Sequence, residues 1–359
     1  MKRLERRHWI WIALGVLVAL FVVVRLLLAG WVADYLNRKM ARMGDYSGHV
    51  TSVDLHLWRG AYSVNGLRVV KRTGKVPVPL LHAPKMDVDV RWDSLLRGAV
   101  VARVVFTRPE INFVDDKTGV STQSGRGVDW RARLESLIPI RLDEVIVRNG
   151  RVHFRNFGSD PPVDIEWTDV DGTVVGLSNT RKASARAASF DLTARMLGDA
   201  PVTANAKFDP LGSLRDFEFA VKVRHVELSK ANAFLQAYAK VDAESGSGDF
   251  VMELEARKGR LDGYAKPLFH NVKLFSWEHD VEKQGDNPLR AAWEALADGI
   301  QNLFKNQSED QFATRVEIHG TIESKEMSAW EAIAGVLHNA FVQAFRPQFE
   351  RLPEKRGRD

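Results

Sequence analysis

The chain begins with one long apolar stretch, and almost everything after it alternates apolar and polar residues. Residues 9–33 are apolar apart from Arg25. At 1.5 Å per residue, a run of this length crosses a hydrocarbon core of about 30 Å. Four Lys and Arg residues precede it, which favours an N-terminus in the cytoplasm. The pattern predicts a cytoplasmic tail over residues 1–8 and a single transmembrane anchor over residues 9–33.

A cleaved signal peptide is the alternative for such a start. The apolar run is longer than the apolar region of a typical signal peptide, and no clean small-residue cleavage site follows it. Basic residues also follow the run, at Arg38, Lys39 and Arg42. Long domains cross a membrane largely regardless of charge, so we still expect the body of the protein outside the cytoplasm.

Period-two alternation recurs along the rest of the chain. In residues 86–92, 217–223 and 250–256, apolar side chains alternate with mainly charged ones. This pattern is typical of antiparallel strands with one apolar and one wettable face. Short links rich in Gly, Asn and Asp are predicted to be hairpin turns. These links are Asn65-Gly66, Asn149-Gly150, Asp171-Gly172, Lys258-Gly259 and Asp262-Gly263.

Four helices are predicted between the strands. They begin at the capping residues Asp129, Ser229, Asn287 and Ser328, and each carries an apolar stripe with an aromatic residue. Such a stripe most often packs in a core, although it also suits a helix at a membrane surface or over an apolar channel.

These elements predict a mostly β fold. A transmembrane helix is followed by a long, curved antiparallel β-sheet, shaped like a groove, with a few amphipathic helices. After the tail and the anchor, the predicted parts are a β-rich domain over 34–285, a helix-strand-helix segment over 286–350 and a disordered tail over 351–359.

Composition narrows the chemistry. The 359 residues include no cysteine, which excludes disulfides, thiolate metal sites and a cysteine nucleophile. The net charge of +5 is spread without a basic stripe, so no nucleic acid is expected as a partner. No catalytic, phosphate-binding or metal-ligand motif occurs. We therefore predict no enzyme activity, cofactor or metal. His49, His56, His153 and His319 fall on the polar side of strands and are predicted to be solvated.

Two segments resemble a known family. Residues 85–98, followed by residues 104–113, resemble the opening repeat of AsmA-like proteins: a strand, a one-turn segment of the form S-L-x-x-G, a return strand and a P-x-I strand. Residues 226–235, followed by residues 248–256, are similar to the later helix, glycine turn and strand of that family. On these residues the chain is identified as a short member of the family that includes AsmA and TamB.

The resemblance implies both a place and a role. It implies a curved β-sheet with an apolar interior, anchored by one helix in the inner membrane of a Gram-negative-type bacterium, with the bulk in the periplasm. It also implies movement of phospholipid towards the outer envelope, or maintenance of that envelope and of the outer membrane. The family carries over no catalytic residues.

A physical argument for lipid stands beside the resemblance. A sheet with one apolar face must bury that face, and four modest helices cannot cover so many strands. We therefore predict a phospholipid-binding or lipid-transfer protein whose apolar groove holds acyl chains. The predicted lining residues are Leu55, Val88, Val90, Val104, Phe106, Ile165, Phe219, Val221, Val223, Met252, Leu254 and Ile318.

Two other functions are weighed against lipid binding. The first is a non-transporting envelope scaffold, whose sheets close on themselves and whose C-terminal helices, around Trp293 and Trp330, dock an envelope protein partner. The second is an anchored enzyme, which would need a polar pocket with converging carboxylates or histidines.

Overall fold

The computed structural model describes most of the anchor and of the β-rich part of the chain. The described residues are 2–56, 60–90, 101–115, 122–124, 141–177, 188–209, 215–239, 241–276, 311–313 and 315–321. The helices predicted to begin at Asp129, Asn287 and Ser328, and the predicted disordered tail, lie outside these residues.

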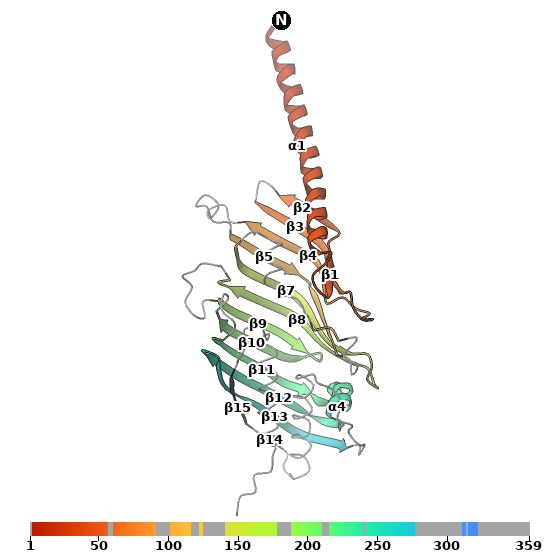
Figure 1. Cartoon of the computed structure of the whole chain (residues 1–359), viewed down its shortest axis with the longest axis vertical. Helices are drawn as coiled ribbons and strands as arrows, with labels where there is room; N and C mark the ends of the chain where they lie inside the picture. The colour runs from red at the N-terminus through yellow and green to blue at the C-terminus, as the bar shows by residue number, and fades with distance from the viewer. Residues whose placement is uncertain are drawn as a thin grey trace, which may run out of the picture.

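The described part of the chain forms one large sheet of 15 strands (Figure 1). Its first half consists of β1 (Tyr46–His49), β2 (Ser52–His56), β3 (Ala61–Lys71), β4 (Leu81–Val90), β5 (Val101–Thr107), β6 (Glu110–Val114) and β7 (Arg141–Asn156). Its second half consists of β8 (Val163–Val175), β9 (Ala188–Met196), β10 (Ala200–Phe208), β11 (Phe217–Glu227), β12 (Val241–Arg257), β13 (Arg260–Ser276), β14 (Gln311–Ala313) and β15 (Val316–Thr321). The mostly β class predicted from the alternation is therefore confirmed.

The sheet is mixed, which corrects the prediction of a purely antiparallel one. Strands β5 and β6 both pair with β7 in parallel, whereas the other pairings are antiparallel. A parallel neighbour requires a long connection, and residues 115–140 between β6 and β7 supply one. The sequence shows that the segment between β6 and β7 is long, but it does not show in which direction β7 runs.

The helix α1 (Lys2–Met40) has 39 residues and is about 58 Å long. Figure 1 shows it projecting along the long axis, away from the β1–β3 end of the sheet. Its last turns pack on the sheet, where Leu36 and Met40 are buried against Val53 and Val64. The helix therefore runs through residue 33, where the predicted boundary between the anchor and the β-rich domain falls.

Within the described residues, no helix is long and apolar enough to cross a membrane. The transmembrane anchor predicted over residues 9–33 thus stays a prediction.

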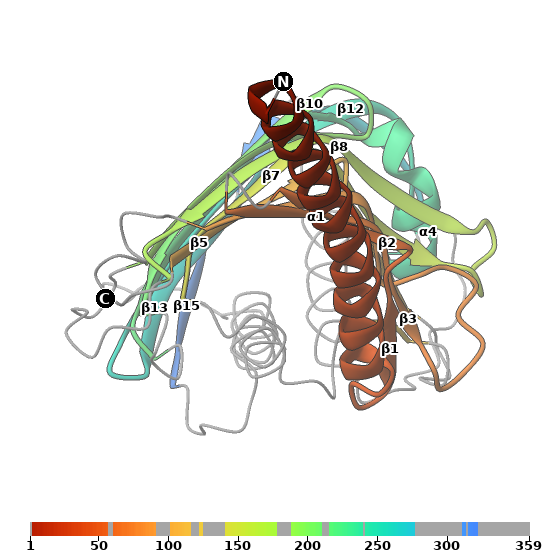
Figure 2. The ribbon, with the colours of Figure 1, turned by 90° about the horizontal axis from the view of Figure 1, so that it is seen from above.

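Four of the five predicted hairpin turns lie inside strands instead. Only Lys258-Gly259 joins two strands, β12 and β13. At Asn149-Gly150 the pairing of β7 with β8 shifts register, and Asn149 has a φ of 50°. Both a bulge and a hairpin turn can require a residue with a positive φ, and Asn and Gly tolerate that conformation in either setting. A bulge bends a strand without ending it, and Figure 2 shows the sheet curved into an arch.

One helix packs over the sheet between β11 and β12. A 3-10 turn, η2 (Leu228–Ala231), leads into α4 (Asn232–Ala239). The predicted cap at Ser229 is wrong, because the Ser229 hydroxyl donates to the Glu227 carboxylate instead of a backbone group. The helix was nonetheless correctly placed, because its apolar residues Phe234 and Tyr238 pack against Phe154 of β7.

Candidate functional site

Two unbroken rows of side chains cross one face of the sheet, the first from β2 to β15 and the second from β2 to β13. Residues paired across neighbouring strands share a face, so the registers define each row. The first row is Leu55, Tyr62, Val88, Val104, Val145, Val174, Phe190, Ala206, Phe219, Leu254, Gly263 and Ile318. The second is Val53, Val64, Met86, Phe106, Val147, Gly172, Leu192, Ala204, Val221, Met252 and Ala265. We call these two rows the apolar ladder.

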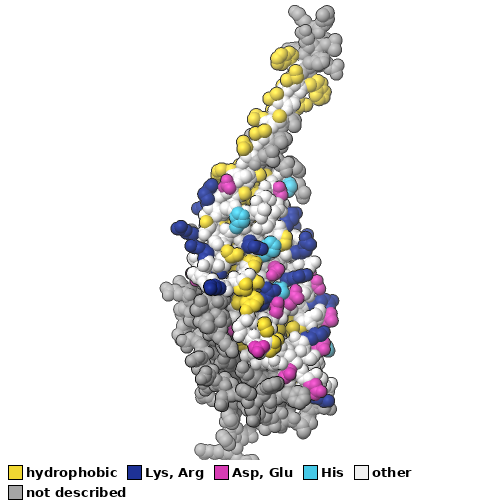
Figure 3. Space-filling view, turned by 90° about the vertical axis from the view of Figure 1, so that its right-hand side faces the viewer, with side chains coloured by type: hydrophobic (Ala, Val, Ile, Leu, Met, Phe, Trp, Pro, Cys, Tyr) yellow, Lys and Arg dark blue, Asp and Glu magenta, His cyan; other side chains and the backbone are white. Residues whose placement is uncertain are grey.

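The opposite face is mainly polar. The row between the two rows of the ladder is Asp54, Ser63, Asp87, Val105, Ile146, Thr173, Asp191, Asn205, Ala220, Glu253, Tyr264 and Glu317. Its polar groups are paired locally: the Ser63 hydroxyl donates to Asp87 at 2.5 Å, and Lys85 lies 3.0 Å from the same carboxylate. Figure 3 shows acidic and basic side chains mixed over the body of the sheet.

The apolar ladder lies on the inside of the arch. The end of α1 packs on the ladder residues Val53, Leu55 and Val64, and Figure 2 shows this helix beneath the curved sheet. The concave surface is thus apolar and the convex surface mainly polar.

The registers bring eleven of the twelve predicted lining residues onto this concave face, including Val223 opposite Val202 and Ile165 opposite Phe154. They differ in how much surface they keep. Buried side chains are those of Leu55, Val88, Val104, Val223, Met252, Leu254 and Ile318. Half-buried ones are those of Phe106, Ile165, Phe219 and Val221. The Val90 side chain lies outside the described set.

Sequence reasoning missed several ladder residues. Val145, Val174, Phe190 and Leu192 lie on the same face and are half-buried. Alternation over residues 188–196 carried the signal for Phe190 and Leu192. Tyr62 was also missed, because a tyrosine in an alternating strand gives no indication of the side to which it points.

A buried hydrogen-bond network holds α4 against the edge of this face. The Tyr238 hydroxyl donates to Asp115 at 2.7 Å and accepts from the Asn156 amide at 3.0 Å. The Asp115 backbone N–H in turn donates to the Arg155 carbonyl at 2.8 Å. All three side chains are buried. The network joins the end of β6, the end of β7 and α4, so its role is structural.

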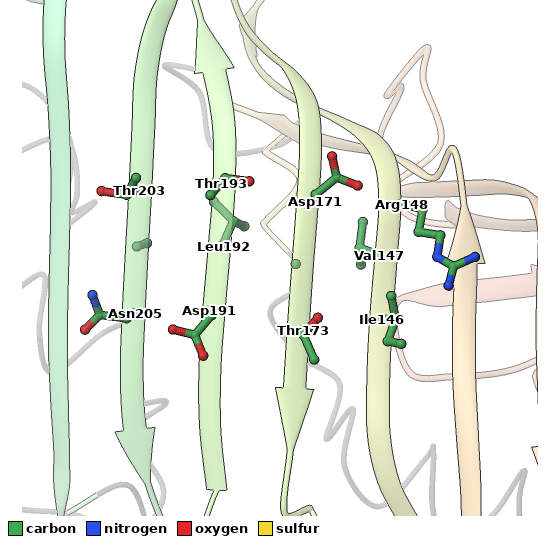
Figure 4. A pocket seen from close by; sticks show the side chains of 12 residues that line it. Ile146, Val147, Arg148, Asp171, Thr173, Asp191, Leu192, Thr193, Thr203 and Asn205 are labelled. Carbon is green, nitrogen blue, oxygen red and sulfur yellow. The ribbon is translucent and has the colours of Figure 1, made fainter.

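The convex face carries a shallow hollow of about 470 Å³ over β7–β10. Figure 4 shows its polar side chains, among them Asp171, Asp191 and Thr193. The Asp171 carboxylate accepts the backbone N–H of Asn149 at 3.1 Å, across the bulge. The hollow therefore coincides with the bulges, where strand spacing is irregular.

One histidine departs from its predicted environment. His49 and His319 are exposed and His56 is half-buried, but His153 is buried on the polar face. Its Nδ1 lies 2.8 Å from Asp164, and Arg155 approaches the same carboxylate at 3.1 Å. Alternation places the ring on the polar face but does not reveal that it is buried there. Among the residues with described positions, no cluster of His, Cys, Asp and Glu suits a metal ion.

Comparison with known proteins adds no relative. No protein-family model matches the chain, and none of the curated proteins searched matches it significantly. The resemblance to AsmA-like proteins therefore stays a prediction, and the function is argued from the two faces of the sheet.

Proposed function

We propose that the protein is a membrane-anchored lipid-binding protein of the bacterial envelope, which holds phospholipid acyl chains along the apolar ladder and carries them along it. The observation on which this depends is the continuity of the two rows across up to twelve strand positions. At about 4.8 Å between strands, the rows extend for about 50 Å.

The chemistry of the ladder selects the occupant. Its side chains are aliphatic or aromatic, with a single tyrosine, so they offer almost no hydrogen bonds to a peptide, a sugar or a nucleotide. A hydrocarbon chain needs none, and each CH₂ that it buries contributes about 0.8 kcal/mol. A phospholipid headgroup would remain at the rim of the arch, in water.

The helix α1 is the proposed inner-membrane anchor, with the sheet in the periplasm. Large apolar side chains on its projecting part are exposed: Trp9 by 72%, Leu17 by 64% and Leu27 by 70%. Such a patch on a monomer marks a surface that is covered by something other than water. Because the same helix ends on the concave face, an anchor here would bring the bilayer next to the start of the ladder.

One observation favours the alternative of a non-transporting scaffold. Val88, Leu254 and Ile318, at both ends of the ladder, are at most 3% exposed. Apolar groups that are already shielded gain nothing from a lipid. If the half-buried residues between them were shielded as well, the concave face would be a dry core, and the protein would act through contacts with an envelope protein partner.

Photo-crosslinking in cells that express the full chain separates the two functions. A photoreactive phenylalanine analogue replaces Phe219, which lies in the ladder far from α1. The matched control places the same analogue at Tyr264, an aromatic residue on the polar face. We expect phospholipid adducts, detected by mass spectrometry, at position 219 only. Adducts at neither position would overturn the lipid function, and equal adducts at both would show bulk contact with the bilayer.

A further inference from the structure

One polar group interrupts the apolar ladder close to α1. Tyr62 of β3 lies between Leu55 and Val88 in the first row. Apart from Tyr62, the side chains of both rows are aliphatic groups, phenyl groups or methionine thioethers, or the residue is glycine. A single phenol on so uniform a surface calls for an explanation.

The ring of Tyr62 lies at a boundary in the concave face. It packs against the cluster that α1 covers, which includes Leu55 and Val64. It also packs against the separate cluster of Val88 and Val104, together with Phe106. Tyr62 is therefore placed where the part of the face beneath α1 gives way to the rest of the ladder.

The hydroxyl has no partner in the described part of the chain. No hydrogen bond to it is found there, and its oxygen is not among the enclosed polar atoms that lack a partner. Burial of the ring raises the pKa of Tyr62 to about 12. The group is thus a neutral, half-buried donor on the concave face, with no acceptor among the described residues. A ligand that covers this face would take any remaining water from the hydroxyl, and an acceptor on the ligand would offset that loss.

We propose that the Tyr62 hydroxyl donates a hydrogen bond to an ester carbonyl of a phospholipid whose acyl chains lie on the ladder. This inference rests on the proposed function. An ester carbonyl is neutral, accepts without donating and sits where the acyl chains meet the headgroup. A phosphate would bring its charge onto an apolar surface, at a large cost in desolvation. Tyr62 is then a positioning contact, which sets how far along the ladder a lipid lies.

The test compares ester-linked and ether-linked lipids. The full chain, with the photoreactive analogue at Phe106 beside Tyr62, is reconstituted in vesicles. The vesicles contain equal amounts of a diacyl phosphatidylcholine and of its dialkyl ether analogue, which has the same headgroup but no carbonyl. We expect about fivefold more ester adduct than ether adduct, which corresponds to one hydrogen bond. Tyr62→Phe, which removes only the hydroxyl, should bring the ratio to one. Tyr264→Phe on the polar face should leave it unchanged.

The outcomes separate this inference from the proposed function. Adducts with both lipids in equal amounts in the unsubstituted protein would overturn the role of Tyr62 and leave lipid binding intact. An ester preference that survives Tyr62→Phe would do the same, and would assign the preference to another group. Adducts with neither lipid would remove the basis of both proposals.

Discussion

The side chain of Asn37, near the end of α1, pairs with both backbone groups of Val50. Its amide nitrogen donates to the Val50 carbonyl at 3.1 Å, and its amide oxygen accepts the Val50 N–H at 2.8 Å. Val50 lies between β1 and β2 and is 1% exposed. Neither of its backbone groups belongs to a strand pairing there, so a side chain has taken the place of a neighbouring strand. This contact fixes the angle at which the helix leaves the sheet.

Asn37→Ala should therefore loosen the junction of helix and sheet. Two backbone groups in a buried segment would lose their partners, at about 1 to 3 kcal/mol for each group left unsatisfied. Hydrogen exchange of the Val50 amide measures this directly, and we expect its protection to fall in the variant. Asn37→Asp should have an intermediate effect, because it keeps an acceptor for the N–H but sets an oxygen against the carbonyl.

Asn65→Ala is the matched control for this pair. Its amide also makes two hydrogen bonds, to the Ser52 hydroxyl at 3.2 Å and to the Asp54 carboxylate at 2.7 Å, but at an exposed site. Water can replace those partners, so stability should change little. If Val50 protection were the same in Asn37→Ala as in the unsubstituted protein, the contact would not hold the helix.

The same contact recurs at the second helix of the concave face. Asn232, the first residue of α4, donates to the Ala243 carbonyl and accepts its N–H, both at 2.9 Å. In each case an asparagine on a helix pairs with both backbone groups of a residue that follows it closely in the chain. Neither pair was predicted, because an asparagine next to a helix boundary is more simply read as a cap or a turn residue.

Sequence reasoning succeeded where one periodicity decided the structure. Alternation along residues 217–223 and 250–256 placed Phe219, Val221, Met252 and Leu254 on one face, and the registers agree. It failed where one residue type serves two purposes. Asn149-Gly150 was read as a hairpin turn, yet it forms a bulge within β7. The parallel pairing of β7 depends on contacts far apart in the chain, and no local pattern encodes it.

A glycine of the ladder is required by the close approach of two strands. A Cβ at Gly263 would lie 2.2 Å from the Glu253 carbonyl oxygen and 2.9 Å from the Leu254 Cα. Both are backbone atoms, so the strands β12 and β13 would have to move apart. Gly263→Ala should therefore destabilise the protein by about 1 to 3 kcal/mol, as overpacking does elsewhere. Chemical denaturation of the full chain measures the loss.

Gly172 provides the comparison on the same face. A Cβ there would meet its nearest atom, the Asp191 carbonyl oxygen, at 3.6 Å, which is ordinary contact. Gly172→Ala should therefore change the free energy of unfolding by less than about 0.5 kcal/mol. Equal losses of stability in Gly263→Ala and Gly172→Ala would mean that the close approach of β12 and β13 is not the reason for a glycine at position 263.

Tyr62 should make the protein less stable in alkali. Burial raises its pKa from 10.0 to about 12. Above pH 10 the unfolded chain releases the phenolic proton while the folded protein retains it, so the free energy of unfolding falls as pH rises from about 10 to about 12. The fall approaches about 1.4 kcal/mol per pH unit for one proton.

The measurement is chemical denaturation of the unsubstituted protein and of Tyr62→Phe, between about pH 8 and about pH 11. Below about pH 9, the stability of the two proteins should depend on pH in the same way. Above about pH 10, stability should fall more steeply in the protein that keeps the hydroxyl. Identical curves for the two proteins throughout that range would show that the phenol is hydrated in the folded protein. The Tyr62 hydroxyl would then already be hydrogen-bonded to water, and the argument for a lipid acceptor there would fail.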